Sequence, residues 1–572
     1  MPKKSPARVS GPVLLASLLL WAGCGSAVPP ELAPDLILHH GKIITVDPDF
    51  RVVEAAAIKG DRFVAVGSND HVLNLAGSQT PLVDLEGKTA IPGLIDSHIH
   101  ALHFGWHITK HVNFSTGERL TVESMVARIG EWAKNVPPGK WIYARGPYSL
   151  DFVAEGRLPN RWEVDAVTPE NPFFMNMQGH VGLVNSYAMR LARITKRTPD
   201  PKGGKFVRDP KTRELTGIVY EFPAMNPFRS LIPRHSLEDN LNAVRRANEV
   251  FNSLGITSVV NLAMPQWEFA VLRQLWRDEG LTVRWTAMLR ADARVFLNKP
   301  YAEVEAEMRA LGPPTRFGND WLKINGIKIV LDGFVEAAYM REPYLEDIFG
   351  KGWRGILLWD RESLKSVLRA AGKYGIQVAI HVTGDAAVDV ALEVMDEVDR
   401  EYPVAGRRWS LEHAGVMPTE ENLEVAERLK VIISTQQSMG WSIGKTFKKW
   451  WGPEMGGIFA PNRTWLQALG HPYLKAGSDN RPINPFIGFW AYLARKDVDG
   501  EVAKPEESLG REDTLRLYTI NAAYGIFEEK ERGSIEAGKL ADLVVLSEDI
   551  LSAPEDRVRE IKPVMTVVGG KI

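Results

Sequence analysis

The sequence predicts an α/β protein built on a (β/α)₈ TIM barrel, with a small β-sandwich domain formed by both chain ends. Strand-like runs alternate with amphipathic helical stretches through the middle of the chain, which is the pattern of βαβ units. Short strands punctuated by Gly and Asp fill both ends. A large insertion after barrel strand one is the third predicted part.

Eight apolar, β-branched runs are the predicted barrel strands, because a strand buried on both faces reads as a continuous hydrophobic run. They are residues 94–98, 257–262, 284–289, 323–331, 377–381, 409–413, 431–435 and 473–476. Helical stretches such as RESLKSVLRAAGKYG lie between most of them. In such a barrel the chemistry lies at the carboxyl ends of the strands.

These patterns also predict the domain boundaries. Residues 1–27 are expected to be a leader, and the insertion is expected to cap the barrel mouth. The remaining parts are residues 28–90 and 531–572 for the β-sandwich, 91–104 for barrel strand one, 105–250 for the insertion and 251–530 for barrel strands two to eight.

Length and charge limit the kinds of partner. A chain of 572 residues is long enough for at least two structural units. The net charge of −2 gives no indication of nucleic acid or another polyanionic partner. We therefore expect a small-molecule substrate, and a homo-oligomer is compatible with the sequence.

The N-terminus has the pattern of an export signal. A basic segment, MPKKSPAR, precedes an apolar run over residues 13–23, which is too short to span a bilayer. Cys24 follows and is the only cysteine of the chain, so it cannot form an internal disulfide. LLLWAGC resembles a bacterial lipobox, apart from Trp21. We expect export from a bacterial cell and a lipid anchor on Cys24; the alternative is a soluble periplasmic or secreted protein cleaved near Ala27.

Metal-ligating residue types gather at the predicted strand ends. Because alternate residues of a strand point to one side, His98 and His100 of IDSHIH can converge on one ion. Imidazole suits zinc and related transition ions. The residues placed at or near strand ends are His98, His100, Lys328, His381, His413 and Asp479. Histidines elsewhere, such as His39, His40 and His71, are expected to be ordinary surface or core residues.

Lys328 is a cation inside the apolar run GIKIVLDG. Burying an unpaired ammonium is costly, so the simple alternatives are escape to solvent or pairing with Asp332. Its place in the order H-x-H, Lys, His, His, Asp favours a functional lysine instead. Lys323 lies five residues earlier, and this odd spacing directs it to the other face unless a bulge intervenes.

IDSHIH, the strand-four lysine, IHVTGD, LEHAG and GSDN, in this order, are similar to motifs of the amidohydrolase superfamily. More narrowly, the chain resembles the YtcJ-like amidohydrolases, which include N-substituted formamide deformylase. The resemblance runs from about residue 35 to 572 and includes GIKIVLDGFVEAAYMREPY and GSIEAGKLADLVVLSED. Phe-Val-Glu-Ala-Ala replaces the Gly-Ser-Arg or Ser-Arg-Thr run common after the strand-four Asp-Gly, a departure in the substrate pocket.

The resemblance implies a divalent metal centre that contains one or two ions, expected to be zinc. His98 and His100 would hold one ion, and His381 and His413 the other. A carbamate formed from CO₂ on Lys328 would bridge them. A mononuclear site is the alternative.

The resemblance also implies a reaction, hydrolysis of an amide or N-formyl C–N bond by a metal-bridging hydroxide. Asp479 would bind the first ion and act as acid and base. His180, in MQGHVGLVN, would polarise the substrate carbonyl, or it is a packing histidine of the insertion.

Two other functions are compatible with the sequence. The same metal site could act on a cyclic amide, a carbamate or an ester. A catalytically dead surface binding protein would lack a ligand, whereas all six ligand candidates are present.

Overall fold

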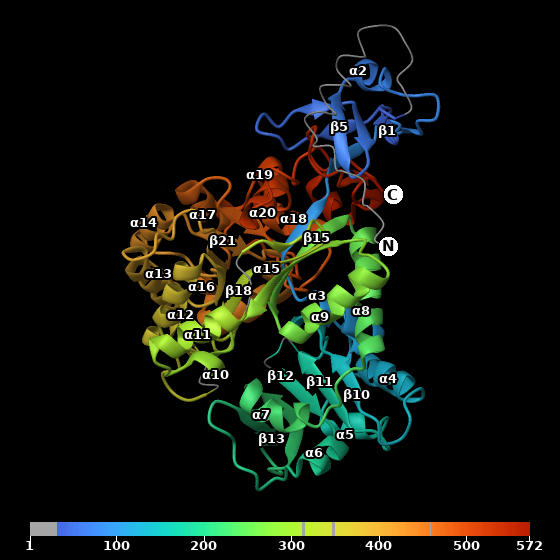
Figure 1. The fold of residues 1–572 in the computed structure, drawn as a ribbon. Coiled ribbons are helices and arrows are strands. Elements are labelled where there is room, and N and C mark those ends of the chain that lie inside the picture. The colour runs from blue at the N-terminus through green and yellow to red at the C-terminus, as the bar shows by residue number, and fades with distance from the viewer. Residues whose placement is uncertain (1–30, 178, 180, 312–314, 346–348, 458) are drawn as a thin grey trace, which may run out of the picture.

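The computed structural model describes residues 31–572 except 178, 180, 312–314, 346–348 and 458. Cys24 and His180 therefore lie outside the described residues. A barrel occupies the centre of the molecule, with a β domain at one end and the insertion at the other (Figure 1).

Eight parallel strands form the barrel, and the predicted TIM barrel is confirmed. In sheet order they are β22 (Leu474–Ala476), β21 (Ile432–Thr435), β20 (Ser410–His413), β19 (Gln377–Val382), β18 (Leu322–Val330), β16 (Arg284–Arg290), β15 (Ile256–Met264) and β8 (Leu94–Ile99). The two ends of this sheet meet. The N–H of Asp479 donates to the His98 carbonyl at 2.7 Å, and Ser97 Oγ donates to the Ala476 carbonyl at 2.7 Å.

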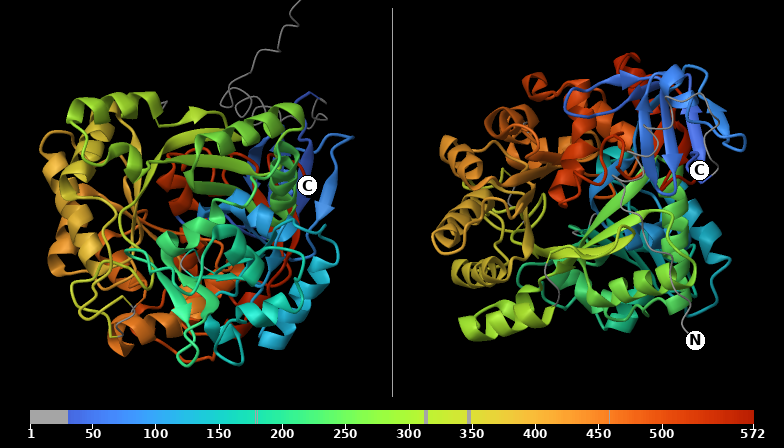
Figure 2. Two further views of the ribbon diagram at one scale, coloured as in Figure 1. Left: turned by 90° about the horizontal axis from the view of Figure 1, so that it is seen from below. Right: turned by 45° about the horizontal axis from the view of Figure 1, so that its top comes forward.

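Helices cover the outside of the barrel, as Figure 2 shows. They are α8 (Leu237–Ser253), α9 (Gln266–Asp278), α11 (Tyr301–Leu311), α12 (Arg361–Tyr374), α13 (Asp385–Asp399), α14 (Glu420–Leu429), α17 (Asn462–Leu469) and α18 (Pro485–Ala494). In α12, Asp360 caps the first turn through the Ser363 N–H at 2.9 Å, and Gly375 ends the helix at φ 66°. The apolar face of α12, including Leu364 and Val367, packs on β18 and β19; each such side chain contributes about 1.5–3 kcal/mol.

Both chain ends build the β domain, as predicted. One sheet contains β5 (Arg62–Gly67), β4 (Ala55–Lys59), β1 (Leu36–His39) and β6 (Leu82–Asp84). The other contains β24 (Pro563–Val567), β23 (Leu543–Leu546), β7 (Thr89–Pro92), β2 (Lys42–Ile44) and β3 (Val52–Val53). β23 pairs antiparallel with β7, so the C-terminal strands complete a sheet begun near the N-terminus.

The insertion after β8 forms a mixed sheet with helices. Its strands are β9 (Val112–Asn113), β10 (Ile142–Arg145), β11 (Phe173–Met177), β12 (Val181–Val184), β13 (Lys205–Arg208) and β14 (Leu215–Tyr220), and its helices are α4 (Val122–Ala133), α5 (Arg161–Asp165), α6 (Ser186–Ala192) and α7 (Glu221–Arg229). It lies on the side of the barrel away from the β domain (Figure 1). The Phe152 ring contacts the ring of Trp441, which lies in the helix Ser438–Trp451 beside the barrel, with centroids 5.5 Å apart.

The other elements are short connections and flanking helices. They are α2 (Asn69–Leu73), α3 (Ala101–Thr109), α10 (Ala293–Phe296), β17 (Phe317–Gly318), α15 (Ser438–Trp451), α16 (Pro453–Gly457), α19 (Arg511–Leu517) and α20 (Ile520–Gly525), with 3₁₀ turns at Leu150–Phe152, Pro505–Glu507 and Glu555–Glu560. Within the described residues, none of the helices combines the length and apolar character that crossing a membrane requires.

Candidate functional site

The carboxyl ends of β8, β20 and β22 bring three buried metal-ligating side chains together. His98, His413 and Asp479 each offer one ligand atom, and these atoms lie within 4.8 Å of one another. His100 joins them, with its Nε2 3.2 Å from Asp479 Oδ1. The two imidazoles of the H-x-H motif therefore face one carboxylate, as the alternation of the strand predicted.

His381 lies beside this group, at the end of β19. Its ring centroid is 4.5 Å from that of His413. Its Nε2 lies 3.3 Å from the Gly333 carbonyl, in the loop after β18, and 3.1 Å from Oγ1 of Thr383, which follows β19. The structure thus brings the ring to the site and directs Nε2 toward this loop.

Lys328 points into the barrel and is buried, with 2% of its surface exposed. Its Nζ has no hydrogen-bond partner among the described residues, and no ion pair joins it to Asp332 there. Burial lowers the pKa of Lys328 to about 8, although Glu412 and Asp479 oppose the shift. A neutral amine is the form that reacts with CO₂, so this orphaned nitrogen beside histidines and a carboxylate fits a carbamate that binds metal.

Lys323 lies toward the other end of β18 and forms an ion pair with the buried Glu528. The pairing of β16 with β18 shifts register midway along the strand. Ile324 accordingly packs among side chains of α8 and α9, while Ile327 packs outward against α12. This register shift is the bulge that would place Lys323 and Lys328 on the same inner face of the strand. The two lysines lie at different depths of the barrel.

Glu412 is a site residue that the sequence did not reveal. His98 Nδ1 lies 2.7 Å from its Oε2, and its Oε1 accepts from Ser410 Oγ at 2.6 Å and Lys475 Nζ at 3.1 Å. Burial alone would raise the pKa of Glu412, but Lys475 and His98 hold it well below its usual range. The ionised carboxylate fixes the His98 ring and leaves Nε2 toward Asp479, which is how outer carboxylates orient metal-binding histidines.

A local distortion explains why neighbouring Glu412 and His413 both serve the site. Successive strand residues normally point to opposite faces. His413 has φ 80° and Ala414 φ 42°, in the left-handed region that non-glycine residues rarely adopt. This strain at the end of β20 breaks the alternation, so both side chains reach His98.

A cavity of about 1020 Å³ lies between the insertion and the barrel loops. Tyr148 and Met177 line it from the insertion, and Phe334, Thr446 and Trp450 line it from the barrel side. The Phe334 ring centroid is 6.0 Å from that of His413, so the cavity adjoins the buried histidines. A small-molecule substrate has room here, between walls that carry aromatic side chains such as Tyr148 and Trp450 and charged ones such as Arg157 and Glu336.

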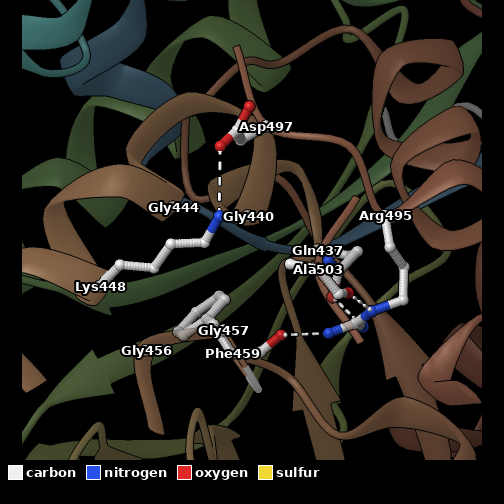
Figure 3. Close-up of a pocket in the computed structure, with 10 residues that line it drawn as sticks. All are labelled: Gln437, Gly440, Gly444, Lys448, Gly456, Gly457, Phe459, Arg495, Asp497 and Ala503. Atoms are coloured by element: carbon white, nitrogen blue, oxygen red, sulfur yellow. Dashed lines mark hydrogen bonds and ion pairs between the residues drawn. The ribbon is translucent and has the colours of Figure 1, made fainter. Parts of the chain in front are cut away.

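A second, far smaller pocket lies beside α15, with a volume of about 10 Å³ (Figure 3). Arg495 donates to the Phe459 carbonyl and to Gln437 Oε1, each at 3.1 Å, and Lys448 Nζ lies 3.4 Å from Asp497. These contacts hold α15 in place. The pocket is too small for an organic substrate and is separate from the histidine cluster.

The fold and the site together define an α/β-barrel protein with a candidate metal centre at the carboxyl ends of its strands. The sequence profile of the amidohydrolase family matches residues 82–572. The chain therefore belongs to the amidohydrolase family, which confirms the resemblance found in the sequence.

Several curated relatives match over nearly the whole chain. N-substituted formamide deformylase of Arthrobacter pascens is 29% identical over 552 residues, covering 94% of this chain and 97% of that protein. YtcJ of Bacillus subtilis (strain 168) is 26% identical over 562 residues, covering 94% and 98%. Among solved structures, an uncharacterized metal-dependent hydrolase from Pyrococcus furiosus is 26% identical with a TM-score of 0.68, covering 90% of this chain and 100% of that one.

Proposed function

We propose that the protein is a metal-dependent amidohydrolase that cleaves the C–N bond of an amide or N-formyl compound. The orphaned Nζ of Lys328, buried beside His98, His413 and Asp479, is the observation that carries this proposal. The likeness to N-substituted formamide deformylase over most of both chains supports the bond type.

The metal-binding residues would be His98, His100, His381, His413, Asp479 and Lys328 as its carbamate. A divalent ion held by these residues would lower the pKa of a bound water and polarise a carbonyl group. Zinc is the first candidate, because imidazole ligands suit it. Burial lowers the pKa of His98 to about 4, so its imidazole is neutral and competent to bind metal at neutral pH.

Asp479 is the proposed acid and base. Burial alone would raise its pKa, but Arg481 and His100 hold the pKa of Asp479 well below its usual range. The group is therefore ionised, and the ionised carboxylate is the form that can accept the proton of the water that attacks the carbonyl carbon. The same proton then passes to the leaving nitrogen as the C–N bond breaks, which yields a carboxylic acid and an amine.

His180 is proposed to polarise the substrate carbonyl from the insertion. The insertion contacts α15 through Phe152 and Trp441, and the role proposed for His180 rests on its place in the motif MQGHVGLVN. A His180→Asn variant should retain its metal and lose most of its turnover. Normal turnover would instead make His180 a packing residue.

A substrate panel tests the bond type. Purified full-length protein is assayed against N-substituted formamides, lactams, carbamates and aryl esters, before and after chelation. We expect the formamides to be hydrolysed fastest and a chelator to abolish turnover. Preference for lactams, carbamates or esters would reassign the bond while keeping the metal site.

We also propose export and lipid anchoring through Cys24, on the basis of the leader and lipobox-like segment. Cells fed a labelled fatty acid should label the wild type and leave Cys24→Ser unlabelled. Equal labelling of the two proteins would exclude a lipid on Cys24 and would favour a soluble exported protein.

A further inference from the structure

Three polar residues meet on the β domain, away from the barrel. His39 ends β1, His40 follows it, and Asp84 ends β6. β1 and β6 pair in parallel with His39 opposite Asp84, so the fold joins residues from two distant parts of the sequence. The β domain that contains β1 lies at the end of the molecule opposite the insertion (Figure 1).

The two histidines point toward one another despite being adjacent in sequence. Residues i and i+1 of a regular strand point to opposite faces. His40 has φ 52°, and this left-handed backbone ends the alternation, so the two ring centroids lie 4.5 Å apart at an interplanar angle of 74°. His40 Nδ1 lies 3.0 Å from Asp84 Oδ2.

We propose that His39, His40 and Asp84 form a second metal site, for a transition ion, on the β domain. One ligand atom from each residue lies within 4.8 Å of the others. Ligand atoms around a tetrahedral zinc ion are about 3.4 Å apart, given metal–ligand bonds of about 2.0–2.1 Å. Small rotations of the side chains therefore suffice to close the site.

Backbone contacts already hold this triad in place. The His40 N–H donates to Asn69 Oδ1 at 2.8 Å, and the His39 carbonyl accepts from the Leu85 N–H at 2.8 Å. The Glu86 N–H donates to Asp84 Oδ1 at 2.8 Å, which leaves Oδ2 facing the imidazole. Little backbone entropy remains to be lost when an ion binds, and such preorganisation favours binding.

His39 supplies the observation that separates a metal site from a surface ion pair. Its Nδ1 is buried and has no hydrogen-bond partner among the described residues. An unmet buried acceptor or donor costs about 1–3 kcal/mol. A pair between His40 and Asp84 accounts for those two residues and leaves this nitrogen without a partner, whereas a cation bound through Nδ1 of His39 would satisfy it.

The ligand types select the ion. Two imidazoles and one carboxylate suit Zn²⁺, Cu²⁺, Ni²⁺ and Co²⁺ and give too few oxygens for Ca²⁺ or Mg²⁺. The side chains of His40 and Asp84 are 52% and 50% exposed, so water can complete the coordination. β6 is the edge strand of its sheet, and the ion would fasten that edge to β1.

Ion counting on the full-length protein tests the site. Wild type, His40→Ala and Asp84→Asn are stripped with a chelator, reloaded with Zn²⁺ and analysed by equilibrium dialysis. His71→Ala is the matched control, because His71 is an exposed histidine on α2 of the same domain. We expect both triad variants to lose one ion per chain, or to bind it at least tenfold more weakly, while the control binds as wild type.

Hydrolytic activity gives the second readout. His40→Ala should hydrolyse substrate at the wild-type rate, because the triad lies outside the barrel. Lys328→Ala should keep the ion of the triad and lose the metal of the barrel site. The visible absorption of bound Co²⁺ reports coordination in each variant. The proposal would be overturned if the wild type and both triad variants bound the same number of Zn²⁺ ions per chain with the same affinity. This outcome does not depend on what the barrel site binds.

Discussion

The side chain of Lys328 is enclosed by the barrel with its amine unpaired among the described residues. Its pKa of about 8, lowered mainly by burial, makes the neutral amine more abundant near neutral pH than in an exposed lysine. Carboxylation would turn this amine into an anion able to lie between cations. The residue therefore gives the simplest test of the site's chemistry.

Lys328→Met should abolish activity and lower the metal content, because the bridging group is lost while Met keeps much of the length of the lysine stem. Lys323→Met is the matched control in the same strand. It leaves Glu528 with Arg532 as its ion-pair partner and should lower the stability while the metal remains. Metal analysis and urea unfolding check both variants, and full metal content and rate in Lys328→Met would exclude the bridge.

Glu412→Gln should weaken metal affinity by about 10–100-fold, because His98 loses the carboxylate that orients its ring. Competition with a coloured chelator measures this affinity. Glu421→Gln, on the exposed start of α14, is the control and should bind metal as wild type. Equal affinity in Glu412→Gln would mean that Glu412 serves the fold alone.

Strand alternation predicted the H-x-H arrangement but could not predict the breaks in alternation. The left-handed backbone at His413 brings Glu412 to the site, and a similar turn at His40 creates the triad with His39. A register shift in β18 keeps Lys323 on the inner face. Each break depends on contacts between distant segments, which a local pattern does not contain.

At the level of elements, a buried ion pair joins the barrel to the β domain. Arg284, at the start of β16, donates from Nε and Nη2 to the two oxygens of Asp542 at 2.8 and 2.9 Å. Both residues are buried, and Asp542 precedes β23. Burial alone would raise the pKa of Asp542, but Arg284 holds it below 3.8.

Asp542→Asn should lower the stability by about 3–5 kcal/mol at neutral pH, because a buried guanidinium loses its counter-charge. A carboxylate with a depressed folded-state pKa stabilises above its unfolded pKa of about 3.9 and loses that contribution as pH falls through the folded pKa. The difference from wild type should therefore shrink below about pH 4. Urea unfolding at several pH values checks this, and a difference independent of pH would contradict it.

At the scale of the whole molecule, a cavity lies between the insertion and the barrel, beside the candidate centre. The alternation of strands and helices predicted the barrel, and the similar style of both chain ends predicted the shared β domain. The cavity walls could not be predicted, because Tyr148 and Thr446 come from parts of the chain that only the tertiary fold brings together.

Thr446→Trp should narrow this cavity from α15, where Thr446 is half-buried. We expect kcat/KM to fall at least tenfold for formamides with bulky N-substituents and to change little for the smallest formamides, with metal content unchanged. Steady-state kinetics over a graded substrate series measures the effect. A uniform loss across the series would show that the substitution disturbs the site rather than its size selection.

The central claim is that the barrel holds a divalent metal that is essential for C–N hydrolysis. The most direct test is elemental analysis of purified His40→Ala protein, whose β domain should contribute no ion, together with a formamide assay. We predict at least one divalent ion per chain, turnover that is lost on chelation, and recovery when zinc is restored. Protein that folds but binds no divalent metal, or that hydrolyses formamides equally well after complete metal removal, would contradict the claim.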